Sequence, residues 1–367
     1  MFSAADHQFM TQALRLAEQG INSTTPNPRV GCVIVKEGRI VGEGWHQRAG
    51  EPHAEVYALR AAGSQARGAT AYVTLEPCKH FGRTPPCADA LISAGVSRVV
   101  AAMQDPNPQV GGGGLSRLRA AGIVAECGLL ETEARELNIG FVSRMTVGRP
   151  WLRLKLAASL DGKTSLNNGL SQWITGPHAR QDGHRWRARA CAILTGIGTV
   201  RSDDPQLNVR GVDTERQPLK VIVDSRLELP LDAKILRDGR VLIAAALDNP
   251  HKMSALRAAG AEVIVLPEPN PQVEQVAQVD LRALMSELGR RGINELHIEA
   301  GLKLNGALIE AGLVDELLLY LAPCLIGDTA RGMFHWPALE SLAGKRLLSI
   351  RDARLVGADL RLLARFS

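Results

Sequence analysis

The sequence predicts a chain of two α/β domains. The chain has 367 residues, which is enough for two domains with full hydrophobic cores. Predicted helices and strands alternate along both halves, as is typical of α/β folds. The segment 148–150 is Gly-Arg-Pro, and because glycine and proline both stop helices, it predicts a boundary between residues 1–148 and 149–367.

The first half begins with an amphipathic helix at 6–19, whose apolar side chains lie on or near one face. Two strands at 30–35 and 39–44 form a predicted hairpin about the Glu37-Gly38 turn. The next elements are helix 53–62, strand 69–77, helix 86–94, strand 97–103, helix 115–121, strand 123–126 and helix 131–145. The four consecutive glycines at 111–114 predict a flexible loop.

The second half is read in the same way, with mostly buried strands between helices. The predicted strands are 151–159, 190–195, 219–224, 240–246, 261–266, 294–299 and 315–322, followed by closing strands at the C-terminus. The predicted helices are 177–189, 251–259, 280–290 and 302–311.

Composition excludes several classes of function. No apolar run approaches the length of a membrane span and the N-terminus lacks a signal-peptide pattern, so we expect a cytoplasmic protein with no membrane partner. Six cysteines in 367 residues do not form a disulfide framework. With 4% aromatic residues and no long basic run, nucleic acid is not an expected partner. The formal charge of +5 suits small anionic ligands such as phosphates.

Three residues of the first half predict a catalytic zinc site. His53 and Cys87 stand at predicted helix starts and Cys78 at a strand end, and together they leave the fourth zinc position open for water. Glu55 follows in His-Ala-Glu and is predicted to carry protons as the catalytic acid and base. This pattern resembles the zinc-deaminase signature H-x-E…P-C-x-x-C, although eight residues rather than two separate the cysteines here.

Two other interpretations stay open at this point. The first is a nucleic-acid or nucleoside zinc deaminase with an appended nucleotide-binding domain, which the long cysteine spacing and the missing basic aromatic groove argue against. The second is a structural zinc site beside a domain that only binds a nucleotide. A closed structural site uses four protein ligands, and here His-Cys-Cys provides three.

Longer stretches show a family resemblance over nearly the whole chain. They are TPNPRVGCVIV, GEGWHQRAGEPHAE, AYVTLEPCKHFGRTPPC, MQDPNPQVGGGG, LKLAASLDGKT, SQWITG, DDPQLNVR and IEAGLKLNGALIEAGLVDE. The chain resembles the bifunctional deaminase/reductase family of riboflavin biosynthesis, in which the eight-residue cysteine spacing is usual. The resemblance implies a cytidine-deaminase-like three-layer domain at 1–148 and a dihydrofolate-reductase-like α/β domain at 149–367.

The resemblance also implies substrates and cofactors. The first domain would use zinc to deaminate 2,5-diamino-6-(5-phosphoribosylamino)pyrimidin-4(3H)-one. The second would reduce the ribosyl chain with NADPH to give 5-amino-6-(5-phosphoribitylamino)uracil. The family further implies a homo-oligomer, a dimer or higher.

Site residues are carried over position by position. In the first domain, the implied substrate-binding residues are Asn27, His80, Arg83, Asp105 and Asn107; the last four stand in turn-forming segments, and Lys79 has no assigned role. In the second domain, they are Lys155, Ser171, Thr175, Arg187, Leu207, Arg210 and Glu299. The implied NADPH-binding residues are Ala157, Trp173, Thr199, Asp203, Ser225, Gly301, Leu302, Lys303, Leu304, Asn305, Gly306 and Ala307.

Two patterns in the second half are read from the residues themselves. Arg180, His184 and Arg187 recur at helical spacing and share one face, which suits a ribose phosphate, whereas Arg185 and Arg189 are read as a solvated basic face. Gly301 opens a predicted helix after a strand, and the free backbone N–H groups there suit a phosphate.

Overall fold

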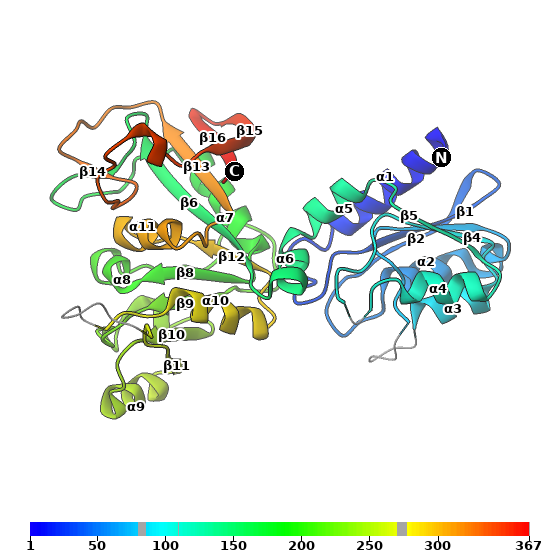
Figure 1. The fold of residues 1–367 in the computed structure, drawn as a ribbon, viewed down its shortest axis with the longest axis horizontal. Helices are drawn as coiled ribbons and strands as arrows, with labels where there is room; N and C mark the ends of the chain where they lie inside the picture. The colour runs from blue at the N-terminus through cyan, green and yellow to red at the C-terminus, as the bar shows by residue number, and fades with distance from the viewer. Residues whose placement is uncertain (80–85, 109, 270–276, 367) are drawn as a thin grey trace. The chain divides into compact units, whose positions relative to one another are not determined.

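A computed structural model describes residues 1–79, 86–108, 110–269 and 277–366. The chain divides into two compact units, Met1–Gly148 and Arg149–Ser367 (Figure 1). Each unit combines one main β-sheet with surrounding helices, which confirms the predicted α/β class.

The first unit is built on a five-stranded sheet with the order β2-β1-β3-β4-β5. Its strands are β1 (Gly31–Lys36), β2 (Arg39–Trp45), β3 (Thr70–Val73), β4 (Arg98–Ala101) and β5 (Val124–Cys127). β1 pairs antiparallel with β2 and β3, whereas β3, β4 and β5 are parallel. The predicted hairpin turn is confirmed: Glu37 and Gly38 both have positive φ, as a two-residue hairpin requires.

Helices cover both faces of this sheet (Figure 1). The helices of this unit are α1 (Ala4–Glu18), α2 (Ala54–Ala62), α3 (Cys87–Ala94), α4 (Gly113–Ala120), α5 (Glu131–Leu137) and α6 (Ile139–Val147), with a 3₁₀ turn η1 (Gly63–Ala66). α2, α3 and α4 lie on one face and α1 and α5 on the other, which makes three layers.

One predicted helix, 131–145, is divided into α5 and α6 at Asn138. The buried Asn138 side chain pairs with the backbone of Arg29, accepting from its N–H at 2.8 Å and donating to its carbonyl at 2.9 Å. Asn138 thereby adopts φ −107°, outside the helical range, and the helix is interrupted. The sequence prediction of one continuous helix was wrong because this pairing joins residues far apart in the chain.

The second unit contains a nine-stranded sheet with the order β11-β10-β9-β8-β12-β6-β13-β16-β15. Its strands are β6 (Trp151–Ser159), β8 (Ala192–Gly196), β9 (Leu219–Val223), β10 (Val241–Ala245), β11 (Ala261–Val265), β12 (Glu295–Ile298), β13 (Glu316–Ala322), β15 (Leu348–Val356) and β16 (Asp359–Phe366). Seven strands from β11 to β13 are parallel, and β16 and β15 add antiparallel partners. A separate two-stranded sheet pairs β7 (Lys163–Ser165) with β14 (Arg331–Gly332).

The inner parallel strands β8 and β10 are buried on both faces. In β8, Ile193 packs into one hydrophobic core and Leu194 into another, and β10 alternates in the same way. The helices around this sheet are α7 (Pro177–Arg189), α8 (Ile197–Asp203), α9 (Pro250–Ala258), α10 (Leu281–Arg290) and α11 (Leu302–Glu310), with 3₁₀ turns η2 (Lys234–Leu236) and η3 (Leu342–Gly344). α8, β7 and β14 were not predicted from the sequence.

Candidate active sites

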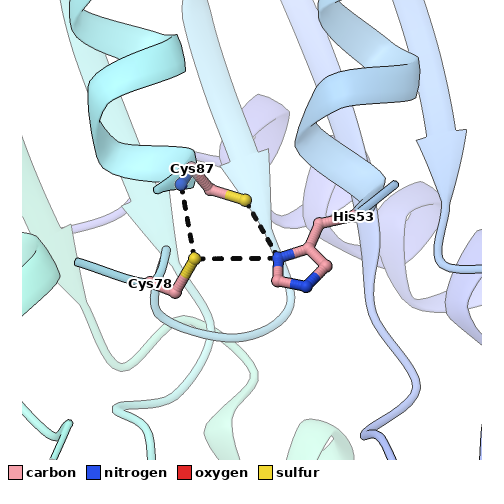
Figure 2. A group of neighbouring side chains, drawn as sticks. All are labelled: His53, Cys78 and Cys87. Atoms are coloured by element: carbon pink, nitrogen blue, oxygen red, sulfur yellow. Dashed lines mark hydrogen bonds between the residues drawn. The ribbon is translucent and has the colours of Figure 1, made fainter. Parts of the chain in front are cut away.

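The predicted zinc ligands meet at one end of the first sheet. His53 is the residue before α2, Cys87 is the first residue of α3, and Cys78 lies in the loop that follows β3. Figure 2 shows the three side chains converging, and their ligand atoms all lie within 4.8 Å of one another. His53 Nδ1 is 3.1 Å from Cys87 Sγ and 3.7 Å from Cys78 Sγ.

This cluster fits a zinc ion. Zinc bonds of about 2.0–2.3 Å in a tetrahedron place neighbouring ligand atoms roughly 3.3–3.8 Å apart, close to the distances found here. The backbone N–H of Cys87, at the start of α3, donates to Cys78 Sγ at 3.3 Å. Hydrogen bonds from Cys87, followed by His53, hold the pKa of the Cys78 thiol well below its usual range, which favours the thiolate that binds metal.

Glu55 is positioned by the first turn of α2, two residues after His53. Its side chain is buried, with 4% of the residue exposed. Burial raises the pKa of its carboxyl group, and the neighbouring His53 opposes that shift. A buried carboxyl group next to a set of metal ligands can accept a proton and return it.

Asn27 is connected to the zinc-ligand loop through His46, which the sequence reasoning did not identify. His46 Nδ1 donates to the carbonyl of Pro52 at 3.1 Å, and its Nε2 is 3.0 Å from Asn27 Nδ2. The ring of His46 also meets that of His53 edge-on, with centroids 5.5 Å apart. The available signal was its place between β2 and His53, in the stretch GWHQRAGEPH.

The remaining predicted residues of the first site are partly described. Asp105 and Asn107 lie in one turn, where Asn107 N donates to Asp105 Oδ1 at 2.8 Å. His80 and Arg83 lie outside the described residues.

A cavity of about 770 Å³ in the second unit gathers most of the predicted reductase residues. Those lining it are Lys155, Ala157, Ser171, Trp173, Thr175, Arg187, Thr199, Asp203, Leu207, Arg210, Glu299, Gly301, Leu302 and Asn305. Ser225, Lys303, Leu304, Gly306 and Ala307 are not in its lining. The walls come from β6, the end of β12, α7, α8 and the start of α11, and such positions beyond parallel strands are common binding sites.

A carboxylate and two cations form the polar centre of this lining. Glu299 Oε2 accepts from Arg187 Nη2 at 2.9 Å and lies 3.7 Å from Lys155 Nζ. Only 13% of the Glu299 side chain is exposed. Burial would raise the pKa of this carboxyl group, but Arg187 and then Lys155 hold it well below the usual range, so Glu299 is an anion.

The predicted shared face of α7 is confirmed, since Arg180, His184 and Arg187 all line the cavity. His184 Nδ1 accepts from the backbone N–H of Arg210 at 3.2 Å. Burial, followed by the charges of Arg187 and Arg210, lowers the pKa of His184 to about 4. His184 therefore enters the cavity as a neutral hydrogen-bonding group.

Arg189 differs from its predicted solvated role. It donates through Nε to Glu295 Oε2 at 2.6 Å, and only 1% of that glutamate side chain is exposed. Arg153 Nη1 lies 3.1 Å from the same oxygen, so Arg189 belongs to a buried ion-pair cluster. Arg185 is exposed, as predicted.

The two glycines of the α11 segment have different roles. Gly301 stands before the first residue of α11, and a Cβ there would meet only Thr199 Oγ1 at 3.6 Å. Gly306 packs against the backbone, and a Cβ there would lie 2.0 Å from the His335 carbonyl. Gly301 thus lines the cavity with free space beside it, whereas Gly306 allows α11 to pack closely against the backbone of His335.

No helix within the described ranges has both the length and the apolar character needed to cross a membrane. The fold and the two sites define a class: a two-domain α/β enzyme with a zinc site of the deaminase type in one unit and a cation-lined cavity suited to a phosphorylated ligand in the other.

Comparison with known proteins agrees with this class. Residues 3–103 match the cytidine and deoxycytidylate deaminase zinc-binding region, and residues 150–359 match the RibD C-terminal domain. The chain is 49% identical to the riboflavin biosynthesis protein RibD of Escherichia coli (97% of this chain, 98% of the relative). It is 48% identical to that of Haemophilus influenzae (98% of this chain, 97% of the relative).

Solved structures show the same likeness over the full length. An Acinetobacter baumannii RibD structure has a TM-score of 0.91 at 45% identity, covering 99% of each chain. A Thermotoga maritima diaminohydroxyphosphoribosylaminopyrimidine deaminase/5-amino-6-(5-phosphoribosylamino)uracil reductase has a TM-score of 0.86 at 30% identity, also covering 99% of each chain. The chain belongs to the RibD family of bifunctional riboflavin biosynthesis deaminase/reductases.

Proposed function

We propose that residues 1–148 deaminate 2,5-diamino-6-(5-phosphoribosylamino)pyrimidin-4(3H)-one and that residues 149–367 reduce the ribosyl chain of the product with NADPH. The final product would be 5-amino-6-(5-phosphoribitylamino)uracil. The observation that carries this proposal is the His53–Cys78–Cys87 cluster beside a buried Glu55, in a chain whose second unit holds a cation-lined cavity. The name of the Thermotoga relative supports these substrates.

In the deamination, His53, Cys78 and Cys87 would hold zinc, whose Lewis acidity makes water a nucleophile near neutral pH. Glu55 accepts a proton from the attacking water and returns it to the leaving amine. A C–O bond forms at the ring carbon, the C–N bond breaks, and ammonia leaves while the ring gains a carbonyl group. The buried position of Glu55 keeps its proton away from bulk solvent.

Several residues are proposed to bind the deaminase substrate. Asn27 offers a side-chain amide next to His46, whose ring meets that of the zinc ligand His53. Asp105 and Asn107 offer polar groups from a single turn. By family resemblance, His80 and Arg83 would meet the phosphate, for which a cation and a hydrogen-bond donor are suitable partners.

In the reduction, NADPH would supply a hydride when bound. The ribosyl carbon that carries the amine gains a C–H bond, its bond to the ring oxygen breaks, and that oxygen takes up one proton, which gives the open ribityl chain. Glu299 and Lys155 are proposed to hold the sugar hydroxyls, and Arg187 and Arg210 to bind the phosphate. Ser171, Thr175 and Leu207 complete the proposed substrate contacts. The proposed NADPH contacts are Ala157, Trp173, Thr199, Asp203, Ser225 and the segment 301–307. Trp173 offers an exposed indole, with the guanidinium of Arg180 4.5 Å from its ring centroid.

Cellular location and assembly complete the proposal. None of the six cysteines is in a disulfide, which favours a reducing compartment such as the cytoplasm. The family resemblance supports a homo-oligomer, and sedimentation equilibrium of the purified chain tests for a dimer or higher state.

The function is tested by comparing the wild type with Glu55→Gln. We expect about one zinc in each protein and a loss of ammonia release by several orders of magnitude in the variant. NADPH oxidation should persist in the variant when the deaminated intermediate is supplied. Normal ammonia release by Glu55→Gln would overturn the role of Glu55.

A further inference from the structure

Glu76 has a buried carboxylate whose hydrogen-bonding capacity is filled by the backbone. Only 3% of the residue is exposed. Oε1 accepts from Gly114 N at 2.8 Å and Leu115 N at 3.1 Å. Oε2 accepts from Gly112 N at 2.8 Å and Asp105 N at 3.2 Å. Because a carboxylate has about four acceptor sites, Glu76 has none left for a metal or a substrate.

All four donors lie within residues 105–108 and 110–115, which include the start of α4 and are called the 105–115 segment below. From Asp105 the chain of hydrogen bonds continues, since its Oδ1 accepts from Asn107 N at 2.8 Å. The backbone N–H of Glu76 also donates to the carbonyl of Met103 at 2.9 Å. Glu76 is therefore linked directly to the turn that carries two proposed substrate-binding residues.

The glycine run 111–114 allows this arrangement. A Cβ on Gly114 would lie 1.8 Å from the carbonyl oxygen of Pro77, the residue before the zinc ligand Cys78. A Cβ on Gly111 would lie 2.8 Å from the Asp105 carbonyl. The prediction of a flexible loop at 111–114 was therefore wrong: the segment is packed against the backbone that leads to the metal cluster and is hydrogen-bonded to Glu76.

We propose that Glu76 is a positioning residue of the deaminase site. By holding the 105–115 segment against the zinc-ligand segment, it sets the affinity for the pyrimidine substrate while contacting neither that substrate nor zinc. The inference rests on the proposed deaminase function, because Asp105 and Asn107 must contact the substrate for their placement to affect binding.

Glu76→Gln tests this role with little change in volume. The new amide NH₂ group faces two backbone N–H groups that lose their acceptor, so the segment should move away. We expect KM for the phosphoribosylated diaminopyrimidine to rise about tenfold or more, with kcat within about threefold of wild type. Zinc content and NADPH-dependent reduction by the second unit should be unchanged.

Asp6→Asn is the matched control. Asp6 is another buried carboxylate of the same unit, but it bonds to Ser3, Tyr72 and Arg98 rather than to the 105–115 segment. It stands on α1, on the opposite face of the sheet from α4 (Figure 1). The Asp6→Asn variant should have a lower melting temperature of this unit, with an unchanged KM for the phosphoribosylated diaminopyrimidine. Hydrogen–deuterium exchange of peptides covering 105–115 should accelerate in Glu76→Gln and not in Asp6→Asn.

Other results would decide against the inference. A Glu76→Gln protein with wild-type KM and a melting temperature lowered like that of Asp6→Asn would make Glu76 merely structural. Loss of zinc from Glu76→Gln would show that it acts through the metal ligands. If Glu76→Gln does not fold, Glu76→Asp keeps both oxygens on a shorter stem, and a wild-type KM for that variant would overturn the inference. A wild type that releases no ammonia would instead overturn the proposed function, and this inference with it.

Discussion

Arg187 on α7 and Glu299 after β12 face each other in the wall of the reductase cavity, with Nη2 2.9 Å from Oε2. The two residues are separated by 112 positions in the chain, and each side chain is largely buried. The pair places a fixed negative charge beside cations that suit a phosphorylated sugar.

Arg187→Met should therefore impair the reductase strongly. The substitution removes the ion pair between Arg187 and Glu299, so that Glu299 keeps Lys155 as a cationic neighbour at 3.7 Å. It also removes a proposed contact to the substrate phosphate. We expect kcat/KM for NADPH-dependent reduction to fall by about a hundredfold or more, because a charge-assisted contact to the phosphate is lost together with the partner that orients Glu299. Ammonia release should be unaffected. The control is Arg185→Met, an exposed position on the same helix, and an equal loss in that variant would contradict the prediction.

The neutral state of His184 predicts a pH dependence of stability. Its pKa is lowered to about 4 in the folded chain, mainly by burial, from an ordinary value near 6.5. As the pH falls, His184 is therefore protonated in the unfolded chain before it is protonated in the folded chain. The free energy of unfolding is unaffected by this residue above about pH 6.5 and decreases as the pH falls from there toward 4. After allowance for partial solvent exposure, the loss between pH 7 and pH 5 should be on the order of 1 kcal/mol.

His184→Asn provides the comparison for that slope. An asparagine oxygen can accept from the Arg210 N–H but does not titrate. Urea unfolding can be monitored by tryptophan fluorescence at pH 7 and at pH 5. The free energy of unfolding of the second unit should decrease less between these pH values in the variant than in the wild type. Identical losses in the two proteins would rule out a contribution from His184.

Metal removal should separate the two activities. A chelator should abolish ammonia release while leaving NADPH oxidation within error, because His53, Cys78 and Cys87 all lie in the first unit. The melting temperature of that unit should also fall, since a metal bound only by the folded chain stabilises it. Added zinc should restore both properties. Ammonia release that survives verified removal of zinc would contradict this interpretation.

The two glycines of α11 should respond differently to alanine. Gly306→Ala places a methyl group 2.0 Å from the His335 carbonyl, so we expect a destabilisation of about 1–3 kcal/mol or more. At Gly301 the methyl group has room and φ is −80°, so Gly301→Ala should fold with a nearly unchanged melting temperature. Differential scanning calorimetry compares the two variants. Equal melting temperatures would show that the close contact between Gly306 and the His335 backbone does not require a glycine.

The zinc cluster could be predicted from sequence because its residue types are rare in combination and each marks the end of an element. The face of Arg180, His184 and Arg187 followed from helical periodicity. Glu76 and His46 could not be assigned in this way. Each acts through hydrogen bonds to backbone or side-chain groups outside its own helix or strand, and such contacts produce no periodic pattern or fixed motif in the sequence. Arg189 was misread for a related reason: its partner Glu295 stands on β12, which only the sheet order brings beside α7.

The division of the chain at Gly148 and Arg149 has a consequence for metabolic flux. Because one polypeptide carries both units, every act of translation makes the two activities in equal numbers. Their ratio cannot be altered by gene expression. At given concentrations of substrate and NADPH, the steady-state amount of the deaminated intermediate is therefore set by the catalytic efficiencies of the two units. Substitutions that slow the second unit, such as Arg187→Met, should make that intermediate accumulate.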